Sequence, residues 1–167
     1  MRFITQKQKE DCIQALQNSI TLWTQIVEDI RYMAPEILPV SMDDIKQDAL
    51  SRLMENRQLE KLPMPISWCY LCDYNEIYAN TAYAECSNEI CEKLCPVDWG
   101  GSLSHKGKPC PCYGPNSIYR KLLCLLGEKG TPEQKKAAIA SAEVYADEIL
   151  TRMYKALAET EKQEKTK

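Results

Sequence analysis

Histidine is almost absent from this 167-residue chain, in which His105 is the only one. A single histidine excludes metalloproteases of the H-E-x-x-H type, which need two. It also excludes Ser-His or Cys-His catalysis that would use any histidine other than His105. Glycine-rich phosphate loops of the forms G-x-x-x-x-G-K-[ST] and G-x-G-x-x-G are also missing. The sequence therefore carries neither a histidine-based catalytic motif of these kinds nor a phosphate-binding loop, and we expect a protein that is not an enzyme.

Long apolar runs are missing too, because no uninterrupted stretch approaches the roughly 20 residues that a membrane helix needs. The first residues, Met1-Arg2-Phe3-Ile4-Thr5-Gln6-Lys7, become polar before a signal-peptide core forms. The net charge of −3 gives no general attraction to nucleic acid or to an anionic membrane. We therefore expect a cytoplasmic protein that does not bind a membrane.

An apolar stripe with helical spacing follows the N-terminus. Thr5 and Gln8 have the spacing of a capping box, and Pro35 and Pro39 mark where the helix must end. The stripe could pack against the protein's own helices, which we favour for so short a pattern, or could form the seam of a homodimeric coiled coil. Its members are Ile13, Leu16, Ile20, Trp23, Val27 and Ile30.

A second helix is predicted to begin near Ser41, because Asp43 and Asp44 suit its positive first turn. We expect it to end before Pro63. The residues predicted to be buried are Ile45, Ala49, Leu50, Leu53 and Met54.

Two further helices are predicted near the C-terminus. One begins at Asn116-Ser117 and ends at Gly127; the other begins with Thr131 as its cap, Pro132 in the first turn and Gln134 completing a capping box. The charged tail from Glu159 onward is expected to fray. The predicted buried face of the last helix is Ile139, Ala142, Ala146, Ile149, Met153 and Ala156, widened by Leu150 and Leu157.

The middle of the chain has a different composition. Of nine cysteines, seven lie between positions 69 and 112, among turn-forming glycines and prolines. Such a segment cannot bury enough apolar surface to become ordered without a cross-link, and clustered cysteines in a reducing compartment favour metal binding. We predict one mostly α-helical domain, made of a helical pair (5–62), an irregular central zinc-binding cysteine module (66–115) and a second helical pair (116–160).

Thiolates that are close in sequence can supply zinc with two of its four tetrahedral ligands at a time. The module contains a C-x₂-C, a C-x₃-C and a C-x-C pair. We predict that the first two pairs, Cys69 with Cys72 and Cys91 with Cys95, bind one zinc ion. Substitute ligands, or those of a second site, would be Cys86, Cys110, Cys112 and His105, although a lone histidine is more often a solvated loop residue.

Two other chemistries remain open for these cysteines. Cys95-Pro96 resembles the end of ferredoxin-type iron–sulfur runs, although the other spacings do not fit. Trp68-Cys69 and Cys72 form the W-C-x-x-C of thiol redox enzymes, but no alternating strand–helix pattern surrounds them. Cys12 and Cys124 lie in apolar helical stretches and are expected to act as small buried hydrophobes.

The charge of the module favours a protein partner over nucleic acid. Between positions 69 and 112 there are six acidic residues, three lysines and no arginine, and phosphate binding depends on cations. Nucleic-acid binding through Arg120, Lys121, Lys129, Lys135 and Lys136, or the sequestering of a small nucleotide, remains an alternative. The module's aromatics could stack on bases or anchor a protein interface. They are Tyr70, Tyr74, Tyr78, Tyr83, Trp99 and Tyr113.

The cysteine spacing resembles that of a loose group of small, uncharacterised phage and prophage proteins. Their pattern is C-x-L-C, then C-x₂-C-P, then a cysteine near a tyrosine-containing turn, and finally an alanine-rich helix. The counterparts here are the pair at Cys69, residues 91–96, Cys110 with Tyr113 and Tyr119, and the helix after Pro132. The second pair here has one extra residue. The resemblance implies a phage accessory factor, acting in the host cytoplasm by binding or inhibiting a host protein.

Overall fold

The computed structural model describes residues 5–55, 70–71, 74, 95–100, 112, 114 and 116–163. Four α-helices are defined there, α1 (Gln6–Arg31), α2 (Met42–Glu55), α5 (Ile118–Leu126) and α6 (Pro132–Lys162), together with the 3₁₀ helix η1 (Pro35–Ile37). These described stretches contain no β-strand, and no helix in them is both long and apolar enough to cross a bilayer. The prediction of a mostly helical fold is confirmed.

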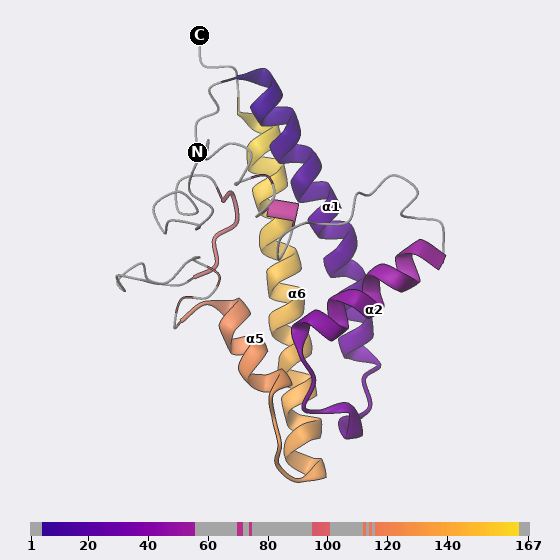
Figure 1. Cartoon of the computed structure of the whole chain (residues 1–167). Helices are drawn as coiled ribbons and strands as arrows, with labels where there is room; N and C mark the ends of the chain where they lie inside the picture. The colour runs from indigo at the N-terminus through magenta and orange to yellow at the C-terminus, as the bar shows by residue number, and fades with distance from the viewer. Residues whose placement is uncertain are drawn as a thin grey trace, which may run out of the picture.

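The two longest helices, α1 and α6, lie side by side and run in opposite directions (Figure 1). At one end, Lys9 Nζ donates to the carbonyl oxygens of Glu161 and Gln163 at 2.8 and 2.6 Å. At the other end, Arg31 Nε donates to Glu143 Oε1 at 2.6 Å. The predicted buried face of α6 is confirmed, because its six members are all buried: Ile139, Ala142, Ala146, Ile149, Met153 and Ala156. This antiparallel pair is the body on which the other segments pack.

The apolar stripe of α1 is buried against the protein's own helices. Five of its six predicted members are buried, and Ile13 is half-buried. The buried face is wider than one stripe because α1 packs against both α6 and α2. Packing within the chain, rather than a coiled-coil seam, therefore occupies this face. The additional buried apolar residues are Cys12, Ala15, Leu22 and Ile26.

Helix α2 crosses α1 and begins as predicted. Ser41 Oγ accepts a hydrogen bond from the backbone N–H of Asp44 at 3.1 Å, which caps the helix. Four of the five residues predicted to be buried are buried, but Met54 is 61% exposed. The expectation for Met54 was wrong. Its neighbour Leu53 is only 2% exposed, so the last turn of α2 is packed on one side, and Met54 lies at the open edge of that buried face.

The C-terminal helices begin at the predicted residues. Ser117 caps α5, Gly127 ends it, and Thr131 with Gln134 forms the capping box of α6. The predicted fraying from Glu159 was wrong for the first part of the tail, because α6 continues to Lys162 and Thr160 is only 2% exposed. The lysine at position 9 holds this last turn against α1.

Candidate functional site

Two of the predicted metal ligands, Cys95 and Cys112, are among the described residues, and both are half-buried against the hydrophobic core. The other six lie outside the described residues: Cys69, Cys72, Cys86, Cys91, Cys110 and His105. Within the described part of the chain, no three His, Cys, Asp or Glu side chains are grouped so that they could hold a metal ion. The candidate site is therefore built from these two cysteines and from the residues that attach the cysteine-rich segment to the helices.

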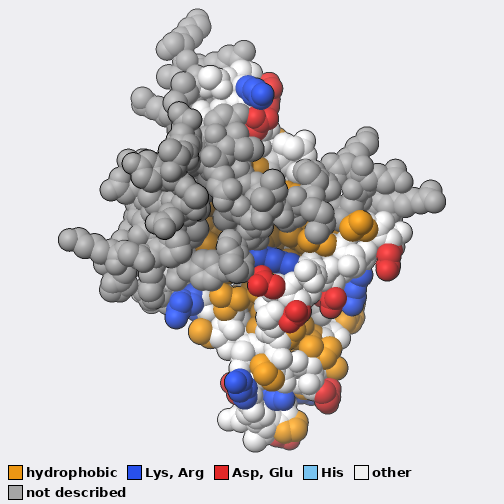
Figure 2. All heavy atoms as spheres, viewed as in Figure 1, with side chains coloured by type: hydrophobic (Ala, Val, Ile, Leu, Met, Phe, Trp, Pro, Cys, Tyr) orange, Lys and Arg blue, Asp and Glu red, His pale blue; other side chains and the backbone are white. Residues whose placement is uncertain are grey.

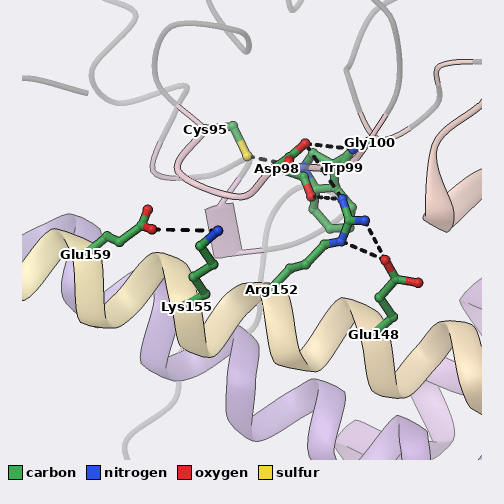
Figure 3. A network of polar contacts seen from close by, with 8 residues as sticks. All are labelled: Cys95, Asp98, Trp99, Gly100, Glu148, Arg152, Lys155 and Glu159. Atoms are coloured by element: carbon green, nitrogen blue, oxygen red, sulfur yellow. Dashed lines mark hydrogen bonds and ion pairs between the residues drawn. The ribbon is translucent and has the colours of Figure 1, made fainter.

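The sulfur of Cys95 accepts a hydrogen bond from an indole. Trp99 Nε1 lies 3.4 Å from Cys95 Sγ, four residues earlier in the chain, so the segment folds back on itself (Figure 3). The Trp99 side chain is only 6% exposed and Val97 only 5%. The sulfur is consequently oriented by a buried donor.

The Trp99 indole belongs to an aromatic cluster that joins the segment to two helices. Its ring meets the ring of Tyr119 on α5 edge-on, with centroids 6.1 Å apart, and Tyr119 meets Trp23 of α1 at the same distance and in the same manner. Lys46 Nζ of α2 lies 5.8 Å from the Tyr119 centroid. Edge-to-face pairs add to the stabilisation from burial, so Trp99 fixes the position of Cys95 relative to the core.

Arg152 of α6 holds the residue next to Trp99. Its Nη1 donates to the carbonyl oxygen of Asp98 at 2.7 Å and lies 3.7 Å from the Asp98 carboxylate (Figure 3). Glu148, one turn earlier on α6, accepts from the same guanidinium and orients it. Asp98 Oδ1 in turn accepts from the N–H of Gly100 at 2.8 Å, closing a tight turn.

Gly100 is required in this turn for two reasons. Its φ of +68° lies in the left-handed region, which other residues rarely adopt. In addition, a Cβ atom at this position would lie 3.0 Å from Arg152 Nη1. A side chain here would strain the backbone and push the arginine away from Asp98.

Cys112 is attached to the start of α5. Ser117, which is fully buried, donates from Oγ to the carbonyl oxygen of Cys112, and the same Oγ accepts from the N–H of Arg120 at 3.1 Å. The next residue, Ile118, donates its N–H to the carbonyl oxygen of Trp99 at 3.1 Å. Two consecutive residues of one helix start therefore hold the Cys95–Trp99 segment and Cys112.

A third attachment lies within the first cysteine pair. Tyr70 and Leu71, which separate Cys69 from Cys72 in the sequence, are 5% and 1% exposed, and Tyr74 is 3% exposed. The Tyr74 side chain lies near the thiol of Cys12 on α1 and lowers the pKa of that thiol. The residues between and after the C-x₂-C cysteines are thus part of the same core as the helices.

The thiol of Cys12 is unsuited to chemistry. Its side chain is 0% exposed, and this burial raises its pKa from 9.0 to about 11, although the neighbouring side chains of Tyr74 and Thr160 lower it. The expectation of a small buried hydrophobe is confirmed for Cys12. It was wrong for Cys124, which is exposed because it lies on the outer side of α5, between the buried turns at Leu122 and Leu126.

The predicted aromatic surface needs correction. Tyr70, Tyr74 and Trp99 are core residues, because aromatic rings near the cysteines supply the apolar area that docks the segment. They are not available to stack on bases or to anchor a partner. Tyr78, Tyr83 and Tyr113 lie outside the described residues.

The basic residues proposed for nucleic-acid binding are partly engaged within the protein. Lys135 Nζ donates to the carbonyl oxygen of Leu38 at 2.7 Å, and Lys121 Nζ lies 5.7 Å from the centroid of the Tyr145 ring. On the described part of the face in Figure 2, basic and acidic side chains are interspersed with apolar ones rather than gathered by sign. On the described part of this face, the mixture gives a phosphate backbone no continuous track of cations.

Sequence reasoning missed Arg152, Ser117 and the internal role of Trp99. The signal for Ser117 was its position as a helix cap, but a cap motif does not reveal that its hydroxyl also bonds Cys112. Arg152 lies half-buried on α6, 54 residues from Asp98 in sequence. A long-range bond to a backbone carbonyl leaves no local pattern.

In comparisons with known proteins, no family model, no curated protein and no solved structure matches the chain.

Proposed function

We propose that this chain is a non-enzymatic binding protein whose cysteine-rich segment is held in shape by zinc, and that it acts as a phage-encoded accessory factor on a host protein. The predicted ligands remain Cys69, Cys72, Cys91 and Cys95. The observation that carries the proposal is the N–H···S hydrogen bond from Trp99 to Cys95. Donors of this kind accompany metal-bound thiolates and tune them.

The donor chemistry around Cys95 fits a bound zinc ion. Its sulfur is half-buried, contacts a buried indole N–H and lies on a turn that Arg152 holds from α6. Zinc binds thiolates at tetrahedral geometry and contributes directly to folding where the surrounding chain has little apolar area of its own. The segment has three attachments to the core, at Tyr70–Leu71, at Trp99 and at Ser117. A zinc ion bound by cysteines of this segment would link the three attached parts of the segment to one another.

Charge supports a protein as the partner class. Six acidic residues against three lysines between positions 69 and 112 give a negative segment, and four thiolates on one zinc ion would add a further net −2. Such a surface complements a basic protein surface and speeds encounter with it. The resemblance in cysteine spacing to phage proteins supports a host protein as the target.

The test is capture of partners by the tagged full-length protein, with and without prior removal of metal by a chelator. We expect capture of a protein partner. This capture should withstand nuclease treatment, should be lost when the metal is removed, and should weaken when Glu89 and Glu92 are both changed to lysine. Matched reversals at Glu10 and Glu36, which are exposed on other parts of the chain, should leave capture unchanged.

Three results would count against the proposal. Nucleic acid shifted in a gel at physiological salt, with the shift abolished by reversing Lys135 and Lys136, would make the chain a nucleic-acid binder. Reduction of insulin disulfides that disappears in Cys69→Ser would make it a thiol redox protein. Capture that is unaffected by the chelator would separate binding from any metal.

A further inference from the structure

Cys95 and Cys112 lie 17 positions apart in sequence but are tied to neighbouring residues of one helix start. Trp99, which bonds the sulfur of Cys95, accepts at its carbonyl oxygen from the N–H of Ile118. The carbonyl oxygen of Cys112 accepts from Ser117, the residue before. Adjacent Cα atoms are about 3.8 Å apart, so both cysteines are anchored at one corner of the molecule.

We infer that Cys95 and Cys112 bind the same metal ion, with Cys112 rather than Cys110 as the ligand from the C-x-C pair. This inference rests on the proposed function, and it changes the predicted ligand set. Because zinc takes four ligands, Cys112, which was only a substitute, replaces one of the three predicted ligands other than Cys95. It also assigns Trp99 as a positioning residue, which orients the Cys95 sulfur without contacting the metal. Each thiol loses its proton on binding zinc, which leaves two thiolates facing one divalent cation.

Three observations of the described residues support the assignment. Both cysteines are half-buried and pack against the same hydrophobic core. The backbone of Cys112 is fixed by a fully buried serine, so its side chain is held on a rigid element rather than on a swinging loop. The sulfur of Cys95 is oriented by the Trp99 indole.

The two other described cysteines provide internal controls. Cys124 is exposed on α5, whereas Cys12 is fully buried on α1. A thiol reagent added to the zinc-loaded protein should therefore modify Cys124 at once and leave Cys12 unmodified until the protein unfolds. Ligand cysteines should differ from both, because they are protected while the metal is bound and become reactive when it leaves.

The experiment compares Cys112→Ser with its matched control, Cys110→Ser, in the full-length protein. Competition for zinc against a chromophoric chelator should show at least about tenfold weaker binding for Cys112→Ser and wild-type binding for Cys110→Ser, because loss of a ligand costs more than loss of a neighbour. Cys112→His, which restores a zinc ligand, should recover part of the affinity. Trp99→Phe should weaken zinc binding less than Cys112→Ser does.

A measurement on the wild-type protein covers the case in which Cys112→Ser fails to fold. Mass spectrometry after timed alkylation should show Cys95 and Cys112 protected together with zinc and reactive together once a chelator is added. Wild-type protein that binds no zinc would overturn the proposed function and this inference with it. Wild-type protein that binds zinc while Cys112 stays reactive, or while Cys110→Ser alone loses the metal, would overturn only the inference.

Discussion

Arg152 of α6 donates a hydrogen bond to the backbone carbonyl of Asp98, with 2.7 Å between Nη1 and the oxygen. The two residues are 54 positions apart, and this bond joins the longest helix to the turn that follows Cys95. The Arg152 side chain is 25% exposed whereas that of Asp98 is 89% exposed. The contribution therefore comes from the bond to the carbonyl more than from the exposed ion pair.

Replacing Arg152 by methionine keeps the aliphatic length and removes the donor. We expect a loss of about 1–2 kcal/mol in the free energy of unfolding, since a charged donor to a carbonyl is being removed, and faster amide exchange in residues 95–100. Chemical denaturation and hydrogen exchange measure the two effects. Lys155→Met is the control, because Lys155 is 75% exposed and lies 3.9 Å from Glu159, and its effect should stay within about 0.5 kcal/mol. Equal effects of both variants would refute an anchoring role for Arg152.

Gly100→Ala should perturb the same turn from the other side. An alanine in the left-handed region costs about 1 kcal/mol. The new Cβ would also lie only 3.0 Å from Arg152 Nη1, so the arginine side chain would have to move. Gly127→Ala is a suitable control, because its φ is negative and its Cβ would meet only ordinary contacts at 3.5 Å. Thermal denaturation should place Gly100→Ala clearly below Gly127→Ala; the reverse order would contradict the geometry.

The carboxylate of Asp29 should make stability depend on pH. Its side chain is 8% exposed, its Oδ1 pairs with Arg52 Nη1 at 2.7 Å and accepts from Gln25 at 3.0 Å, and within the described residues its Oδ2 is buried without a hydrogen-bond partner. Burial raises the pKa of Asp29 above its ordinary 3.8, and the nearby charges of Asp48 and Glu28 act in the same direction.

The folded protein therefore retains this proton to a higher pH than the unfolded chain does. The stabilisation that the protonated Asp29 carboxyl provides is fully present below pH 3.8, the ordinary pKa of this group. It is lost as the pH rises through the raised pKa of the folded protein. Asp29→Asn should remove that loss, so the variant should be at least as stable as the wild type at pH 7 even though it lacks the ion pair. Glu36→Gln, which removes the same charge from an exposed position on η1, is the control. Unfolding measured from pH 3 to 7 decides, and an unchanged slope in Asp29→Asn would rule out this residue as its source.

Cys12 should affect stability at the alkaline end. Its pKa is about 11 in the fold against 9.0 ordinarily, so the unfolded chain ionises first. The stabilisation is complete below pH 9 and declines as pH rises toward 11. Cys12→Ala should flatten this decline, at a cost from lost packing that is present at every pH. Denaturation curves between pH 8 and 11 would reveal it, with Cys124→Ala as the exposed control; parallel curves for wild type and Cys12→Ala would contradict the assignment.

The helices could be read from sequence because their signals are local. A capping box starts α6 at Thr131, a serine starts α5, and the repeat of three and four places Ile139 and Met153 on one buried face. Met54 and Cys124 were predicted wrongly because their exposure depends on which side of α2 or α5 the neighbouring segments cover, and periodicity does not contain that information. The tail at Thr160 was predicted wrongly for the same reason, since Lys9 stabilises it from 152 residues away.

The site was predictable only as a set of residue types. The spacing of Cys69, Cys72, Cys91 and Cys95 predicts a metal, but it does not rank Cys112 above Cys110. The inference in favour of Cys112 rests on the bond between Ser117 and the Cys112 carbonyl. The role of Trp99 was likewise not predictable, because tryptophan is a residue type that suits an interface, whereas Trp99 is buried in the core. Whether an aromatic residue faces a partner or its own helices is set by tertiary packing.

The metal content of the full-length protein, purified under reducing conditions without added chelator, tests the central claim most directly. The account predicts at least one zinc ion per chain, a protein that is colourless, and a melting temperature that falls when a strong chelator removes the metal. Metal-free protein that melts at the same temperature with and without chelator would contradict it, and brown absorption with bound iron would replace zinc by an iron–sulfur cluster.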